Sequence, residues 1–177
     1  IEQQLPRVGI YPEFLYQASR YRANRYAEGM KKALQNRELI KECLNEYRDD
    51  EHKMKKDDVY WPVSVFCGKC QKDTTKITDY DGEWNISYKC ECGNCETVDL
   101  RTFKGAKLGW RVDWPMRWNE EKVVFEPGGK DHISPGGSYD TAKLVSKKIY
   151  DWDAPVTMRY DFVNLKGVPG KMSSSKG

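Results

Sequence analysis

Residues 125–140 read Phe-Glu-Pro-Gly-Gly-Lys-Asp-His-Ile-Ser-Pro-Gly-Gly-Ser-Tyr-Asp, and this stretch departs most from an ordinary soluble sequence. Residues 123–125 predict a short buried strand before the glycines, and residues 141–150 predict a helix after them. A strand, a glycine loop and a helix in this order place backbone N–H groups and a positive helix end where an anion or a ribose can bind. Glycine suits such a loop because a Cβ atom would block the ligand. Similar loops also occur for purely structural reasons, so this stretch alone leaves both interpretations open.

The composition sets wide limits on the class of protein. A chain of 177 residues can hold one domain of ordinary size, with or without a small insert. The net charge of +3, from 30 basic and 27 acidic residues, neither requires nor excludes a nucleic-acid partner. No apolar run approaches the roughly 20 residues of a membrane span, and the N-terminus lacks a signal-peptide pattern, so we expect a cytoplasmic protein with no membrane partner. The start at Ile1 and the end at Gly177 suggest a piece of a longer protein.

Residues 1–60 predict a polar, helical lead-in. One helix follows Asn24 and another follows Asn36, both suitable N-caps, and the short break between the helices favours an antiparallel helical hairpin. Cys43 lies among the apolar positions of the second helix, so we interpret it as a core residue rather than a metal ligand. Several basic residues either form a solvated face, which is the default, or contact RNA phosphates. They are Arg20, Arg22, Arg25, Lys31 and Lys32.

Two groups of cysteines frame residues 61–105. The run Cys67-Gly68-Lys69-Cys70 is matched downstream by Cys90-Glu91-Cys92-Gly93-Asn94-Cys95, and residues 74–79 and 83–88 between them predict a β-hairpin. This arrangement is typical of a zinc ribbon, in which four thiolates fill a tetrahedral shell and the metal is structural. Disulfides are the alternative, which the lack of a secretory signal disfavours. The repeat of Cys-Gly-x-Cys makes Cys67, Cys70, Cys92 and Cys95 the preferred ligands, with Cys90 as the rival for a place in the second pair.

The segment from Leu108 to Trp118 carries three tryptophans and two arginines. Alternation would place Trp110, Val112 and Trp114 on one face of a strand. These indoles either pack in the core or form an apolar wall and a cation–π surface for a ligand. A further strand is predicted at residues 156–162, which contain Tyr160.

The chain ends with Lys171-Met172-Ser173-Ser174-Ser175-Lys176-Gly177. This run resembles the Lys-Met-Ser-Lys-Ser signature loop of class I aminoacyl-tRNA synthetases, from which it departs at Ser174, where the family has lysine. A lysine and several hydroxyl groups on a mobile loop can hold a triphosphate while charge develops on the leaving pyrophosphate. Together with Val112–Trp118 and Phe125–Asp140, this loop resembles the class I lysyl-tRNA synthetase family. The resemblance covers most of the chain, from about Tyr16 onward.

The resemblance implies roles for individual residues. In this family a Gly-x-Asp element at the end of a strand binds the adenosine ribose, and Gly129-Lys130-Asp131 occupies that place. His132 would contact the ribose or the amino acid, or else it is a satisfied core histidine. The residues implied in phosphate and ATP binding are Lys171, Met172, Ser173 and Ser175. The candidates for the lysine pocket are Trp110, Trp114, His132 and Tyr160, and no carboxylate partner for the ε-ammonium group is identifiable.

The same resemblance implies the chemistry of a whole enzyme. Such an enzyme activates lysine with ATP and Mg²⁺ to lysyl-adenylate and transfers the lysyl group to tRNA(Lys), and it carries structural Zn²⁺. No His-Ile-Gly-His-like signature occurs in this chain, so it looks like the part between the connecting insert and the second signature. That part alone is expected to be inactive. The rival hypothesis is a zinc-ribbon module that binds RNA or protein without catalysis.

These elements together predict an α/β architecture. We expect the second half of a Rossmann-type parallel sheet, preceded by a helical hairpin and a zinc-ribbon insert. The expected divisions are a helical connecting region at residues 1–60, the ribbon insert at 61–105, and the second half of a catalytic nucleotide-binding domain at 106–177.

Overall fold

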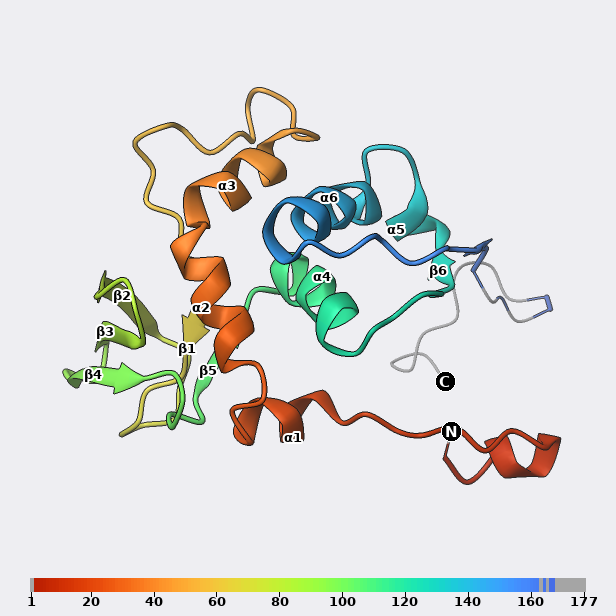
Figure 1. Ribbon diagram of the computed structural model, residues 1–177, viewed down its shortest axis with the longest axis horizontal. Helices are drawn as coiled ribbons and strands as arrows, with labels where there is room; N and C mark the ends of the chain where they lie inside the picture. The colour runs from red at the N-terminus through yellow and green to blue at the C-terminus, as the bar shows by residue number, and fades with distance from the viewer. Residues whose placement is uncertain (1, 163, 165, 168–177) are drawn as a thin grey trace.

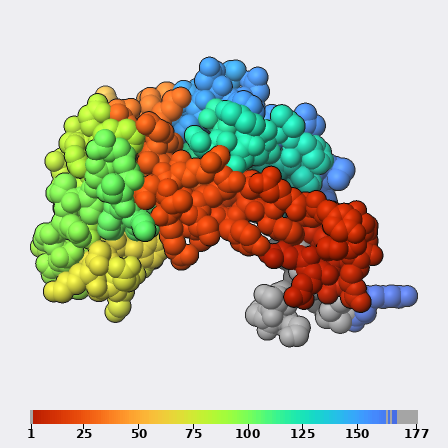
Figure 2. Space-filling model, turned by 60° about the horizontal axis from the view of Figure 1, so that its bottom comes forward, coloured from red at the N-terminus to blue at the C-terminus, as the bar shows by residue number. Residues whose placement is uncertain are grey.

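A computed structural model describes residues 2–162, 164, 166 and 167 of the chain (Figure 1). A three-stranded sheet lies at one side, the later helices lie at the other, and helix α2 passes between them. In the space-filling view the molecule is arched, with the sheet (yellow and green) at one end and the N-terminal residues (red) at the other (Figure 2). No helix in the described part is long and apolar enough to cross a membrane. The chain begins with the 3₁₀-helix η1 (Leu5–Val8) and helix α1 (Gln17–Arg22).

Helices α2 (Ala27–Gln35) and α3 (Arg37–Asn45) follow each other with only Asn36 between them, and the predicted antiparallel hairpin is wrong. The backbone N–H of Asn36 donates to the carbonyl oxygen of Lys32 at 3.2 Å, and that of Ile40 donates to Asn36 at 3.0 Å. Helical hydrogen bonding therefore continues through the junction. One residue cannot reverse the chain, because helical hairpins need loops of about 2–5 residues. The two helices run end to end with a bend at Asn36 (Figure 1).

The apolar face of α2 packs closely on helix α4 (Trp110–Glu120). Gly29 permits this approach, since a Cβ atom there would lie only 2.7 Å from Cγ of Met116, which is fully buried. The hydroxyl of Tyr150 donates to the carbonyl oxygen of Gly29 at 3.2 Å and adds a third element to the contact. Cys43 is buried in the same core, as predicted.

The ribbon is inserted between two short strands. Strand β1 (Val63–Val65) pairs antiparallel with β5 (Ala106–Leu108). Between them, β2 (Thr75–Tyr80), β3 (Asn85–Cys90) and β4 (Cys95–Asp99) form an antiparallel sheet, which confirms the predicted hairpin. Because β1 and β5 lie side by side, the first and last residues of the ribbon insert lie close together.

The tryptophan-rich segment forms helix α4 rather than the predicted strand. Apolar residues at i, i+2 and i+4 fit either structure over so short a run, because i and i+4 also share one face of a helix. In the helix Val112 and Met116 are buried, whereas Trp110 is 51% exposed. Pro115 lies inside the helix and has no N–H to donate to the preceding turn, so α4 lacks one backbone hydrogen bond yet continues to Glu120.

The residues after α4 form a small parallel unit. Two strands, β6 (Gly128–Gly129) and β7 (Arg159–Tyr160), pair in parallel. The helix predicted after the glycine loop is confirmed. The connection between the strands consists of α5 (Lys130–Ile133), α6 (Ser138–Val145) and the π-helix η2 (Ser146–Tyr150).

The described residues do not form the predicted half of a Rossmann-type parallel sheet. Their parallel pairing is limited to β6 with β7 and a bridge between Phe125 and Val156. The buried strand predicted at residues 123–125 is likewise absent, since Val124 is 72% exposed and Phe125 54%. Parallel sheets need apolar strands covered on both faces, whereas β7 is exposed and β6 consists of two glycines. The result is a mixed α/β molecule with small sheets.

Replacing Gly29 with alanine tests the close contact between α2 and α4. The added Cβ atom would lie 2.7 Å from Cγ and 3.0 Å from Sδ of Met116. We expect overpacking to outweigh the gain of about 1 kcal/mol in helix propensity and to lower the free energy of unfolding by about 1–2 kcal/mol in urea. The exposed neighbour provides a control, because Glu28→Ala should change this free energy by less than about 0.5 kcal/mol. Equal stability of Gly29→Ala and the parent would contradict the packing argument.

Candidate functional site

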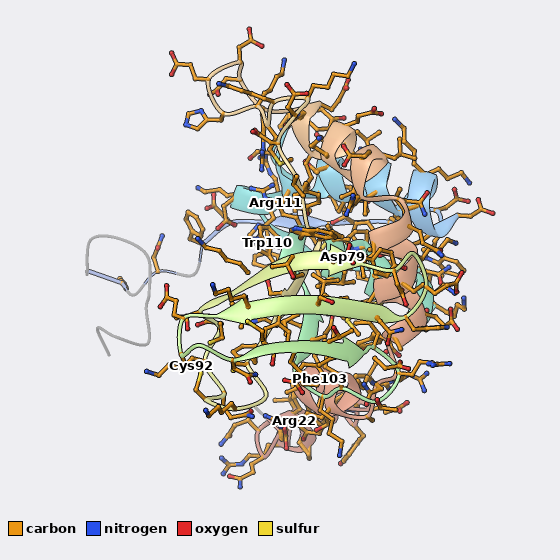
Figure 3. The ribbon with its side chains drawn as sticks, turned by 90° about the vertical axis from the view of Figure 1, so that its left-hand side faces the viewer. Arg22, Asp79, Cys92, Phe103, Trp110 and Arg111 are labelled. Atoms are coloured by element: carbon orange, nitrogen blue, oxygen red, sulfur yellow. The ribbon has the colours of Figure 1, made fainter. Side chains whose placement is uncertain are left out.

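One face of α4 forms the wall of a hollow of about 280 Å³. Trp110, Trp114 and Arg117 line it from α4, and His132 lines it from α5. The i, i+4, i+7 spacing places the three α4 residues on one face of the helix. The imidazole ring of His132 meets both indoles edge-on, with centroids 5.9 Å from Trp110 and 6.2 Å from Trp114. Figure 3 labels Trp110, which lies above the three-stranded sheet in that view.

The carboxylate of Glu126 fixes the indoles behind this hollow. The Nε1–H group of Trp114 lies 2.9 and 3.0 Å from the two carboxylate oxygens, and that of Trp118 donates to the same carboxylate. The backbone N–H of Glu126 donates to Val156 at 3.0 Å, and its carbonyl oxygen accepts from the hydroxyl of Thr157 at 2.8 Å. This residue therefore ties α4 to the segment that leads into β7 and sets the orientation of the Trp114 ring.

Arg117 brings a positive charge to the hollow. Its Nε donates to Oδ2 of Asp113 at 2.8 Å, and Oδ1 of Asp113 accepts from the hydroxyl of Tyr21 at 2.5 Å. Burial and the Asp113 carboxylate raise the pKa of Tyr21, so this hydroxyl stays protonated and remains a donor. A held guanidinium beside two indoles and an imidazole suits a ligand that combines an anionic group with an apolar or cationic part.

The glycine loop adjoins the hollow through α5. A Cβ atom at Gly129 would lie 2.7 Å from Oδ1 of Asp131, an exposed side chain that can shift, and 3.9 Å from the ring of Tyr160. Asp131 is exposed in the first turn of α5. Lys130 pairs with Asp161 at 2.6 Å, and this hydrogen bond lowers the pKa of the Asp161 carboxyl. The loop is thus anchored to the residues that follow β7.

The residues with predicted ligand roles lie in two adjoining places. Trp110, Trp114 and His132 line the hollow, and Gly129 pairs with Tyr160 across β6 and β7. The residues predicted to contact ATP phosphates lie outside the described residues. They are Lys171, Met172, Ser173 and Ser175.

Two residues of the site were missed from sequence. Arg117 follows Trp114 by three positions, a helical spacing that the strand interpretation of this segment concealed. Glu126 carries no sequence signal of its own, because its function depends on two indoles that only the folded helix brings to it.

Four cysteine side chains gather at one end of the ribbon. The sulfur atoms of Cys67, Cys70, Cys90 and Cys92 all lie within 4.8 Å of one another. The sulfur of Cys67 is 3.7 Å from that of Cys92, and the sulfur of Cys70 is 3.6 Å from that of Cys90. Zn–S bonds of about 2.3 Å in a tetrahedral site separate neighbouring sulfurs by roughly 3.8 Å, so this donor set fits such an ion. Cys92 is labelled at the end of the strands in Figure 3.

The preferred ligand set contained Cys95, and the structure has Cys90 in its place. Cys95 lies opposite Lys89 in the pairing of β3 and β4. Directly opposed residues point to the same face of a sheet, whereas neighbours along a strand point to opposite faces. Lys89 and Cys95 are exposed, and Cys90 is 2% exposed, so Cys95 faces away from the cluster. The rival pair of Cys90 and Cys92 is the one that meets Cys67 and Cys70.

Backbone N–H groups make the four thiols unequal. The N–H of Cys70 is the main cause that lowers the pKa of Cys67 to about 6, and the N–H of Cys92 lowers that of Cys90. The N–H of Asn94 lowers the pKa of Cys92, but hydrogen bonds with the neighbouring thiols and burial outweigh it and raise this pKa to about 11. Four adjacent thiolates therefore need a cation if all are to be ionised together.

The sequence matches the family described as tRNA synthetases class I (K) over residues 1–177. The chain belongs to this family. It is 59% identical over 177 residues to the lysine–tRNA ligase of Treponema pallidum strain Nichols. The matched region covers 100% of this chain and 33% of that protein. The chain is 51% identical to the lysine–tRNA ligase of Borreliella burgdorferi and 44% identical to that of Thermococcus kodakarensis, each over 99% of this chain and 33% of the relative. This class I synthetase chain thus spans about a third of the length of the curated relatives it matches, and the resemblance seen in the sequence is confirmed.

Exchange of single cysteines tests which side chains bind a metal ion. Cys90→Ser should lower the affinity for Zn²⁺ by at least about 10-fold, because it removes a ligand, whereas Cys95→Ser should leave the affinity unchanged. Competition with a chelator measures the affinity. The thiolate-to-metal absorption of the Co²⁺ form should fall in Cys90→Ser alone. The opposite ranking of the two variants would restore the ligand set that contains Cys95.

Metal binding by this cluster should release protons. At pH 7 Cys92, with a pKa of about 11, is protonated, whereas Cys67, with a pKa of about 6, is largely ionised. Because the ion binds thiolates, its affinity should rise with pH, and the loss of affinity on acidification should steepen as Cys67 also becomes protonated below about pH 6. Zn²⁺ titrations across this range measure the slope. An affinity independent of pH would show that the ion is not held by these thiols.

Proposed function

We propose that the longer protein represented by this chain is a lysine–tRNA ligase, which forms lysyl-adenylate from lysine and ATP and transfers the lysyl group to tRNA(Lys). The observation that carries the proposal is the 59% identity over all 177 residues to a protein of that name. The hollow on α4 beside a glycine loop supports it, because adenylate formation needs an amino-acid pocket next to a nucleotide site. We place this protein in the cytoplasm, without a membrane partner.

In this proposal the glycine loop binds adenosine. Gly129 leaves room for the ligand because it has no Cβ atom, and the carboxylate of Asp131 accepts hydrogen bonds from the ribose hydroxyls. The exposure of Asp131 in the first turn of α5 supports this role. His132 follows it and contacts both indoles, so it lies between the nucleotide and the amino acid.

The hollow on α4 receives the lysine substrate. Its aliphatic stem packs on the indoles of Trp110 and Trp114, and the 52% exposed ring of Tyr160 is available across β6 and β7. A cation over an indole face gains about 0.5–1 kcal/mol at an exposed site and more when it is desolvated. The ε-ammonium group must avoid the guanidinium of Arg117, which leaves the indole faces as its favourable surroundings.

The reaction needs orientation and charge stabilisation rather than a protein nucleophile. The lysine carboxylate attacks the α-phosphorus of ATP in line, and pyrophosphate leaves. Lys171, Ser173 and Ser175, beside Met172, hold the phosphates and stabilise the charge that develops on pyrophosphate. Mg²⁺ enters with ATP and neutralises its phosphates.

The cysteine cluster has a structural role that is separate from the reaction. A Zn²⁺ ion bound by Cys67, Cys70, Cys90 and Cys92 would have a full tetrahedral shell and no position for a substrate. It would join the turn after β1 to the turn between β3 and β4 and so stabilise a ribbon with a small core.

Substitutions in the longer protein test the proposed chemistry. Asp131→Ala and Lys171→Ala should each lower the rate of lysine-dependent ATP–pyrophosphate exchange by about 100-fold or more, because each removes a contact to the reacting nucleotide. Asp153→Ala removes an exposed acid that pairs with Lys147 and should leave the rate unchanged. The rival function, a zinc ribbon that binds RNA or protein without catalysis, requires the glycine loop and the terminal loop to be dispensable. Exchange at the parent rate in both site variants would favour that rival.

A further inference from the structure

A second hollow, of about 300 Å³, lies between α1 and the residues around β5. Arg22 lines it from α1, Phe66 and Gln71 line it from the first cysteine turn, and Lys104 and Lys107 complete it. Figure 3 labels Arg22 and Phe103 at the lower edge of the three-stranded sheet, away from Trp110. This basic hollow is thus separate from the one on α4.

Hydrogen bonds hold the two sides of the basic hollow together. The side-chain amide of Asn24, just after α1, donates to the carbonyl oxygens of Leu100 at 3.0 Å and Phe103 at 2.8 Å. The backbone N–H of Leu108 donates to the hydroxyl of Tyr21 at 3.3 Å. Helix α1 is therefore fixed against the residues that precede and form β5, and the hollow is a built feature of the fold.

The third side of the basic hollow belongs to the metal-binding turn. Gln71 has a left-handed backbone, with φ of 61°, and its N–H donates to the carbonyl oxygen of Cys67 at 2.9 Å. Its side-chain amide donates to the carbonyl oxygen of Gly68, also at 2.9 Å. The position of Gln71 thus follows from the same turn that aims Cys67 and Cys70 at the cluster.

The charge of the basic hollow has one sign. Arg22, Lys104 and Lys107 are exposed, no acidic residue lines the hollow, and none of the three forms an ion pair within residues 2–162, 164, 166 and 167. Lys69 and Lys72 in the adjoining turn are also exposed and have no ion pair in this part of the chain, so they extend the positive surface.

The shape and exposure of the basic hollow favour a polymer of phosphates over a single small anion. Water screens each exposed cation, so one small anion gains little, whereas a chain of phosphates adds many such contacts and releases counterions. Phe66 adds a half-buried ring, which Lys107 covers at 4.9 Å from its centroid, beside which a ribose or a base can pack. Asp73 lines a neighbouring hollow together with Lys107 but forms no ion pair with it in the described structure.

We propose that the basic hollow formed by Arg22, Lys104 and Lys107 binds the phosphodiester backbone of tRNA. Membership in a family of tRNA synthetases identifies the polyanion as RNA. The proposal rests on the proposed function, whose transfer step needs tRNA, and adds the place on this chain where the tRNA backbone binds.

Binding of a tRNA(Lys) transcript to the longer protein, followed by fluorescence anisotropy at several salt concentrations, tests this proposal. The variant Arg22→Gln, Lys104→Gln, Lys107→Gln should bind about 10- to 100-fold more weakly near 50 mM salt, and the slope of log K against log salt should fall by about 2–3. The control variant Lys55→Gln, Lys56→Gln, Lys148→Gln removes the same charge from exposed positions elsewhere and should change this slope by less than about 0.5.

Lysine-dependent ATP–pyrophosphate exchange separates this proposal from the proposed activity. Exchange at the parent rate in the hollow variant, together with weaker tRNA binding, would support the basic hollow as an RNA site. Equal salt slopes for the hollow variant and the control would overturn it. Loss of exchange in the parent itself would overturn the proposed activity and leave the tRNA-binding result to stand alone.

Discussion

Two indole N–H groups converge on one carboxylate, that of Glu126, and the hollow on α4 depends on this contact. Trp118 is 1% exposed, so its N–H has no access to water and needs this acceptor. A hydrogen bond to a charged group contributes about 1.5–3 kcal/mol, which is more than an exposed ion pair supplies. With both indoles fixed, the rings of Tyr139 and His132 find edge-on contacts at 5.6–6.3 Å. The shape of the hollow on α4 therefore follows from a residue outside it.

The ribbon depends on a different constraint, which is the proximity of four sulfur atoms. Its outer contacts with α2 are largely polar. Lys31 pairs with Glu83 at 2.5 Å and lies over the ring of Trp84, and the amide of Gln35 donates to Gly82 at 2.9 Å. Partly exposed contacts of this kind contribute at most about 1 kcal/mol each. The buried strand residues and the cysteine cluster must therefore supply most of the stability of the ribbon.

The sequence predicted those features that depend on the spacing of a few neighbouring residues. The predictions were wrong where the structure of a segment depends on contacts with residues distant in sequence. The ribbon hairpin, the helix after the glycine loop and the burial of Cys43 depend on local pattern and are confirmed. The choice between Cys90 and Cys95 depends on strand register, because a shift of one residue exchanges the faces of a strand. The segment from Trp110 to Trp118 fits two periodicities, and packing against Gly29 selects the helix. Family membership could be predicted because its motifs are contiguous, whereas Glu126 could not be found at all.

Tyr21 links the two hollows, since it contributes to both. Its hydroxyl accepts the backbone N–H of Leu108 beside the basic hollow and donates to Asp113, which holds Arg117 in the hollow on α4. Burial and the Asp113 carboxylate raise the pKa of Tyr21, so this hydroxyl can perform both tasks at any physiological pH. Loss of the hydroxyl would disturb both hollows at once and could not separate their functions. Substitution of the exposed cations around the basic hollow can separate the two functions. These cations have no ion-pair partner in the described part of the chain, and their removal leaves the hydrogen bonds of α1 intact.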